Sequence, residues 1–128
     1  MSVSKSRPAW TLEITAPARR DIADILRHSL DEFGAAAELR YNALLKQALR
    51  DLKADPARAG VSQRPGLPDD IRLYHLNTSR ERTAAEVVKT PRHFVAFRLT
   101  AARIEVLRIL HDSRDLARHL PAGHPDAE

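Results

Sequence analysis

The sequence predicts an α+β domain in which an antiparallel hairpin of two helices packs on a mostly antiparallel four-stranded sheet. One strand precedes the hairpin, and a short helix closes the C-terminal end. Two long amphipathic stretches follow each other in the first half of the chain, and two β-rich apolar runs, 94–99 and 104–110, follow in the second half. Neither helix can bury its apolar stripe alone, so the helical pair must lie on a sheet.

Composition agrees with a single domain. The chain has 128 residues, of which 43% are hydrophobic and 30% are charged, enough for one core but not for two comfortable domains. We expect the domain to span residues 10–121, between a loose N-terminus (1–9) and a flexible tail (122–128). No stretch approaches the roughly 20 apolar residues needed to cross a bilayer, and the N-terminus has no signal-peptide pattern. We therefore expect a cytoplasmic protein without membrane contact.

Cysteine and glycine usage narrows the chemistry. The absence of cysteine removes disulfides, thiolate nucleophiles and cysteine-based zinc sites. The histidines have no metal-ligand spacing and the 4 glycines form no phosphate loop, so we expect no metal, no cofactor and no small-molecule substrate. The net charge is +4, and the positive excess lies in the C-terminal half. This balance favours an acidic protein or a nucleic acid as partner.

The first strand and first helix have clear local signals. Residues 10–14 alternate apolar and polar side chains, which is the period of a strand with one buried face. Thr15 and Pro17 then mark the start of a helix, because a hydroxyl caps the first turn and a proline there loses no hydrogen bond. Gly34 ends this helix, as glycine does at a left-handed cap.

A second helix starts at once and carries an apolar stripe from Leu39 to Leu52, closing at Asp55–Pro56. A turn-rich connector, 57–70, leads to a short strand over 71–76. Residues 77–91 leave a mobile loop, a short helix and a short strand all open. The two apolar runs then form a strand hairpin around the break at 100–103, and an amphipathic tail from Asp112 forms the last helix.

Several moderate motifs in this order resemble one family. They are the helical hairpin after the first strand, RPGLPDDIRLYHL at 64–76, PRHFVAFRL at 91–99 and IEVLRILHDSRDLARHLP at 104–121. Together they resemble the RelE/ParE superfamily of toxins from bacterial type II toxin–antitoxin systems, and the ParE branch above all. The segment 77–91 departs from the pattern, because many relatives have a tighter connection there.

The resemblance implies a small toxin that is neutralised by an antitoxin whose C-terminal segment wraps around it. Toxins of the ParE branch poison DNA gyrase, whereas those of the RelE branch cleave mRNA in the ribosomal A site. We expect a gyrase inhibitor that acts by binding and has no catalytic residues. Two alternatives stay open: a ribosome-dependent mRNA endonuclease, and an inactive relative that serves only as an antitoxin-bound corepressor.

An endonuclease would need an acid, a base and cations to hold the charge of the transition state. No tyrosine follows Tyr74, so the titratable candidates near the C-terminus are His111 and His119. A nuclease would use Arg72, Arg98, His111 and Arg114. The simpler interpretation of His111 is that it bonds the backbone or caps the turn after its strand.

Partner contacts have two candidate sources. Arg98 and Arg108 lie one on each strand of the apolar hairpin, where they either pair with an acid such as Glu105 or Asp112 or meet an anionic partner. The structural pairing is the favoured interpretation. In this architecture a groove between the helical hairpin and the sheet edge would accommodate an antitoxin helix. The predicted partner-binding residues are therefore Arg98, Arg108, Arg114, Leu45, Leu49 and Leu52.

Overall fold

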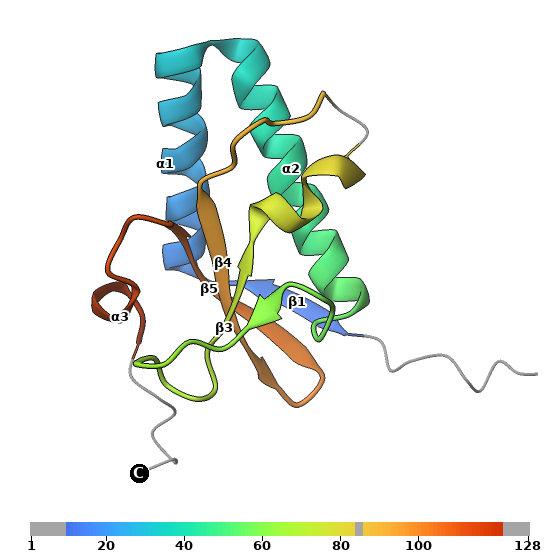
Figure 1. Cartoon of the computed structure of the whole chain (residues 1–128), viewed down its shortest axis with the longest axis vertical. Coiled ribbons are helices and arrows are strands. Elements are labelled where there is room, and N and C mark those ends of the chain that lie inside the picture. The colour runs from blue at the N-terminus through green and yellow to red at the C-terminus, as the bar shows by residue number, and fades with distance from the viewer. Residues whose placement is uncertain (1–9, 84–85, 122–128) are drawn as a thin grey trace, which may run out of the picture.

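The computed structural model describes residues 10–83 and 86–121, and the predicted loose ends, 1–9 and 122–128, lie outside them. Two long helices stand side by side over one face of a sheet (Figure 1). None of the helices in the described ranges is long and apolar enough to cross a membrane. The elements are β1 (Thr11–Ile14), α1 (Ala16–Phe33), α2 (Ala35–Ala54), β2 (Val61–Ser62), β3 (Arg72–His75), the 3₁₀ helix η2 (Leu76–Arg82), β4 (His93–Thr100), β5 (Arg103–His111) and α3 (Leu116–His119).

The α+β prediction is confirmed, and the sheet is mixed. Its strands lie in the order β1-β5-β4-β3-β2. β1 runs parallel to β5, while the other neighbours are antiparallel. The sheet has one strand more than predicted, because Val61 and Ser62 in the turn-rich connector pair with Tyr74 and Leu73. In the segment 77–91, whose structure the sequence left open, η2 covers the first part. Residues 86–92 contain neither helix nor strand and lead to the start of β4.

The predicted cap residues bound the first helix. The Thr15 hydroxyl accepts a hydrogen bond from the Ala18 N–H at 3.3 Å. At the other end, Gly34 has a φ of 94° and donates its N–H to the Leu30 carbonyl at 3.0 Å. This left-handed conformation suits glycine, and it lets α2 begin one residue later.

Both faces of the sheet are covered. The helices bury one face in a core that includes Leu44, Ala48, Leu52, Tyr74, Val95, Phe97, Ile104 and Val106. The opposite face is covered by α3 and the connector before β3, which pack Leu116, Leu67 and Leu120 on Leu73, Ala96, Phe94 and Leu110. Because β4 is buried on both sides, its sequence is apolar on both sides.

The start of α1 continues the pairing of β5 where β1 ends. Thr15 donates its N–H to the Val106 carbonyl at 3.1 Å and its hydroxyl to the Leu107 carbonyl at 3.0 Å. One turn later, Asp21 accepts the Ile109 N–H at 2.9 Å. These side-chain contacts satisfy backbone groups of β5 that lie beyond β1, so they fix α1 against the sheet.

A buried carboxylate joins α2 to η2. Asp51 is 3% exposed and accepts hydrogen bonds from Ser79 at 2.6 Å, Gln47 at 2.9 Å and Arg82 at 3.0 Å, while Arg58 lies 3.5 Å away. Burial opposes ionisation, but the hydrogen bonds and the two cations outweigh it, so the pKa of Asp51 lies below its ordinary value. The network holds the first part of the 77–91 segment on the helical layer.

Candidate functional site

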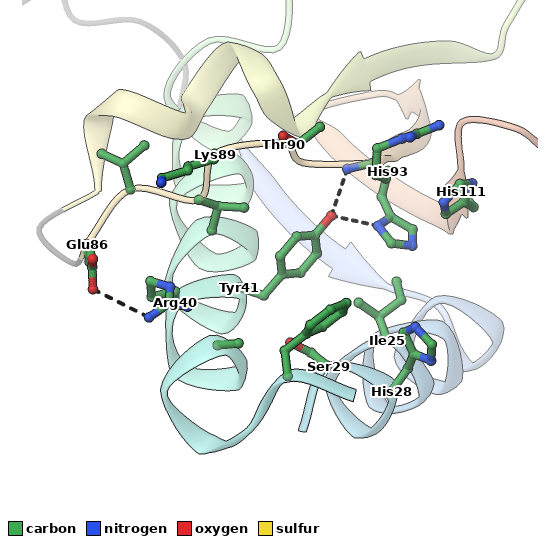
Figure 2. A pocket seen from close by; sticks show the side chains of 15 residues that line it. Ile25, His28, Ser29, Arg40, Tyr41, Glu86, Lys89, Thr90, His93 and His111 are labelled. Atoms are coloured by element: carbon green, nitrogen blue, oxygen red, sulfur yellow. Dashed lines mark hydrogen bonds and ion pairs between the residues drawn. The ribbon is translucent and has the colours of Figure 1, made fainter. Parts of the chain in front are cut away.

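A pocket of about 760 Å³ opens where β4 begins and β5 ends, between the helical hairpin and the segment 86–90. Figure 2 shows Tyr41 projecting from α2 toward His93, with Ile25 and His28 from α1 on the opposite side. The lining combines five apolar side chains with polar and charged ones: Ile25, Phe33, Ala37, Val87, Val88, His28, Ser29, Tyr41, Thr90, His93, His111, Arg40, Lys89, Arg92 and Glu86.

Tyr41 and His93 form the polar floor of the pocket. The Tyr41 hydroxyl oxygen accepts the Arg92 N–H at 3.1 Å and lies 2.7 Å from Nδ1 of His93. The hydroxyl and Nδ1 therefore share one hydrogen bond, whose donor is set by the tautomer of the His93 ring. Burial, helped by the nearby His111, lowers the pKa of His93 to about 4, and burial raises the pKa of Tyr41 to about 12. Both groups are uncharged at neutral pH.

Asp112 ties the ends of three strands together beside this pocket. Its carboxylate accepts hydrogen bonds from Arg92, at 3.1 Å from Nε and 2.8 Å from Nη2. Nε2 of His75 lies 3.0 Å from the second carboxylate oxygen. The Arg92 hydrogen bonds are the main reason that the pKa of Asp112 falls to about 2. At neutral pH the carboxylate is ionised and holds Arg92 at the mouth of the pocket.

Arg98 has the acidic partner that the structural interpretation requires. Its Nε donates to Glu105 on the neighbouring strand at 2.8 Å, and its Nη1 lies 3.6 Å from Asp70. Arg108 is also paired, but with Asp21 rather than with the expected Glu105 or Asp112. Both arginines are half-buried and engaged within the fold.

Of the four residues proposed for a nuclease, one lines this pocket. His111 lines the pocket, whereas Arg72, Arg98 and Arg114 are absent from its lining. Nδ1 of His111 accepts the Ser113 N–H at 3.1 Å, which is the turn-capping contact of the simpler interpretation. Among residues 10–83 and 86–121, no three His, Asp or Glu side chains are placed to hold a metal ion.

The leucine stripe of α2 is mostly core. Leu45 and Leu52 are 2% and 0% exposed, and Leu49 is half-buried at the edge of the core. Leu45 and Leu52 are therefore not accessible to a partner in this structure. The large apolar side chains that are exposed lie at the hairpin turn and on the segment 86–90: Leu30, Phe33, Leu39 and Val87.

Sequence reasoning missed Tyr41, His93 and Arg92 as members of one site. Tyr41 was read as part of the apolar stripe, and 52 residues separate it from His93. Neither residue lies in a recognisable motif. The exposed Phe33 and Leu39 had a usable signal, since they flank Gly34 at the turn, where a sheet covers a helical hairpin least.

The chain is similar to known proteins in sequence and in structure. The model of the family "ParE toxin of type II toxin-antitoxin system, parDE" matches residues 12–116. A solved structure described as "Chromosomal ParDE TA system from P. aeruginosa" is similar, with a TM-score of 0.59, 18% identity, and coverage of 80% of this chain and 96% of that chain. No curated protein matches. The structural likeness shows the fold, and the family model spans most of the chain. The chain therefore belongs to the ParE toxin family of type II toxin–antitoxin systems.

Proposed function

We propose that this toxin inhibits DNA gyrase by binding to it and that a cognate antitoxin neutralises it. The observation that carries the proposal is the ParE family match over residues 12–116. Resemblance to the ParE branch of the superfamily implies DNA gyrase, rather than the ribosome, as the target. Gyrase works in the cytoplasm, so the proposal also places the toxin there.

The side chains support binding rather than RNA cleavage. Arg98 is neutralised by Glu105, and Nδ1 of His111 is occupied by the Ser113 N–H. A general base and the cations that stabilise a phosphorane must face one reacting group. Arg98 and His111 are instead engaged in contacts within the fold, so the arrangement favours a protein that acts through its surface.

Among the residues proposed for partner contacts, Arg114 is the most available. It is exposed, and within the described parts of the chain its side chain forms no ion pair, while its N–H bonds the His111 carbonyl at 3.0 Å. Arg98 and Arg108 would have to give up their acidic partners to bind another protein. We therefore expect Arg114→Ala to impair gyrase inhibition more than Arg98→Ala does.

The test is a titration of the purified toxin into a gyrase supercoiling reaction on relaxed plasmid. We expect a dose-dependent loss of supercoiled product with accumulation of cleaved DNA, and recovery on addition of the antitoxin encoded beside the toxin gene. Full supercoiling at toxin concentrations that arrest growth would contradict the proposal. A ribosome-dependent mRNA cleavage assay would then test the alternative target.

A further inference from the structure

We propose that the 760 Å³ pocket is a specificity-determining subsite for the antitoxin, which takes one bulky apolar side chain flanked by carboxylates. This inference rests on the proposed function, because it takes the antitoxin as the occupant. It adds the position at which a cognate antitoxin is distinguished and the chemistry that distinguishes it.

Apolar side chains border the pocket on two sides. Phe33, at the end of α1, is 72% exposed, and Val87, on the facing segment, is 39% exposed. The His28 ring lies edge-on to the Phe33 ring, with centroids 6.4 Å apart. Two exposed apolar groups around one hollow form a surface that gains free energy when a partner covers it. The volume falls within the range of about 300–1,000 Å³ that is typical of ligand pockets, so it admits a large side chain.

The floor of the pocket tolerates an apolar group. Tyr41 and His93 bond to each other, and the Tyr41 oxygen also accepts the Arg92 N–H. Both side chains are neutral at pH 7, since the pKa of Tyr41 lies at about 12 and that of His93 at about 4. An apolar side chain placed on this floor covers no charge and leaves the Tyr41–His93 hydrogen bond intact, which avoids the largest cost of burying polar groups.

The rim of the pocket favours carboxylates. Its lining includes the cations Arg40, Lys89 and Arg92 against one carboxylate, Glu86. Arg40 pairs with Glu86 at 3.4 Å and Arg92 pairs with Asp112. Across the described ranges no carboxylate lies within ion-pair distance of Lys89, so an acidic residue of the partner would complete this rim. A second copy of the chain fits less well, because each copy has a net charge of +4.

Residues 86–90 form one wall of the pocket. These residues belong to the segment 77–91 that departs from the family pattern in the sequence. Specificity is a difference between affinities for two partners. An antitoxin that lacks the apolar side chain would leave the pocket unfilled. An antitoxin with a basic residue beside that side chain would place a positive charge next to Lys89. The pocket thereby selects among antitoxins that otherwise share the same binding mode.

Matched variants test this inference. The dissociation constant of the antitoxin encoded beside the toxin gene is measured for Phe33→Ala and for Leu39→Ala, since Leu39 is similarly exposed at 68% but lies outside the lining. We expect about a 30-fold weakening for Phe33→Ala, as for an interface hot spot, and less than about 3-fold for Leu39→Ala. Equal thermal midpoints for the two variants would show that the folded state is retained.

The charge pair is tested in the same way. Lys89→Glu at the rim should weaken binding about 10-fold at low salt, and the loss should shrink at high salt. Lys46→Glu makes the same charge change at an exposed position of α2 outside the lining and should have a small effect. A photoreactive residue at position 87 should cross-link to an apolar antitoxin residue within two positions of an Asp or Glu.

The outcomes separate this inference from the proposed function. Equal weakening by Phe33→Ala and Leu39→Ala, with tight wild-type binding, would overturn the subsite and leave neutralisation intact. A cross-link to a basic or purely polar antitoxin segment would also overturn it. If the wild-type chain does not bind the antitoxin at all, both the subsite and neutralisation fail. The gyrase assay without antitoxin reports independently on the target.

Discussion

Asp21 binds Arg108 through both carboxylate oxygens: Oδ2 lies 2.6 Å from Nε and Oδ1 lies 2.9 Å from Nη2. The Oδ2 atom also accepts the Ile109 N–H, and Nη1 of Arg108 donates to the His119 carbonyl at 3.1 Å. The pair thus joins α1, β5 and α3. This carboxylate raises the pKa of Arg108 above its ordinary value, so the guanidinium stays charged.

Replacing this carboxylate should destabilise the fold. Asp21→Ala leaves the half-buried Arg108 charge and the Ile109 N–H without their partner, and we expect a loss of about 2 kcal/mol in the free energy of unfolding. Asp24→Ala, three residues later on the exposed face of α1, should change it by less than about 0.5 kcal/mol. Urea unfolding at pH 7 measures both. Equal effects would mean that the bidentate pair contributes little.

The buried Asp51 network should be as sensitive. Asp51→Ala leaves Ser79, Arg82 and Arg58 facing an apolar methyl group, and we expect a loss of about 3 kcal/mol. Ser79→Ala removes the hydrogen bonds to Asp51 and to the buried Tyr74 hydroxyl and should cost about 2 kcal/mol. Lys53→Ala on the exposed face of α2 is the control. Thermal and urea unfolding measure these losses. If Asp51→Ala were as stable as Lys53→Ala, this account would be contradicted.

Asp112 predicts a loss of stability in acid. Its pKa in the folded protein is about 2, below the ordinary 3.8 of an aspartate side chain. The unfolded chain therefore takes up the proton first. The stability that Arg92 and His75 confer through this carboxylate is complete above pH 4 and is lost as the pH falls toward 2. In Asp112→Asn the fall between pH 4 and pH 2 should be shallower, with the remaining slope owed to groups such as Asp51. Measuring the free energy of unfolding of both proteins between pH 4 and pH 2 at low salt tests this prediction.

His93 predicts a second, separate pH range. Its pKa in the folded protein is about 4, below the ordinary 6.5 of a histidine side chain. Protons bind the unfolded chain first, so the free energy of unfolding should decline as the pH falls from about 6.5 to about 4. NMR of the imidazole ring should show a midpoint near pH 4. Because burial is the main cause of the lowered pKa, Tyr41→Ala, which opens this floor to water, should shift that midpoint upward; an unchanged midpoint would contradict burial as the cause.

His111 separates gyrase binding from RNA cleavage. His111→Ala removes the candidate acid or base together with the contacts of Nδ1 to Ser113 and of the ring to His93, none of which touches gyrase in the proposed function. A toxin that acts by binding gyrase should therefore keep growth arrest in cells that lack the antitoxin, whereas a nuclease should lose it by about 100-fold or more. Growth assays with matched expression levels decide between them. Loss of toxicity in a variant with unchanged thermal stability would favour the endonuclease.

The parts of this fold that the sequence predicts are those with local causes. Thr15 and Gly34 bound α1 because capping depends on neighbouring residues alone. The apolar runs of β4 and β5 reflect burial on both faces, which is visible in the sequence without any partner. β2 was missed because two residues carry no periodicity, and their pairing with β3 depends on where the connector turns.

Long-range pairs lay beyond such reasoning. Asp21 is one of several acids on the polar face of α1, and nothing in its neighbourhood marks it as the partner of Arg108, 87 residues away. Periodicity also does not show how far along a helix the covering sheet extends. The hairpin extends past the end of the sheet (Figure 1), so Leu39 is exposed while Leu45 is buried in the same stripe.

The parallel pairing of β1 with β5 bears on when the toxin becomes active during synthesis. Thr15 and its acceptor Leu107 are 92 residues apart in the sequence. At 5–20 residues per second, the ribosome needs on the order of 10 s to make the stretch that separates them. Throughout that interval β1 has no strand to pair with, and α1 lacks the contacts that fix it on the sheet. The complete sheet can therefore form only after β5 has been synthesised.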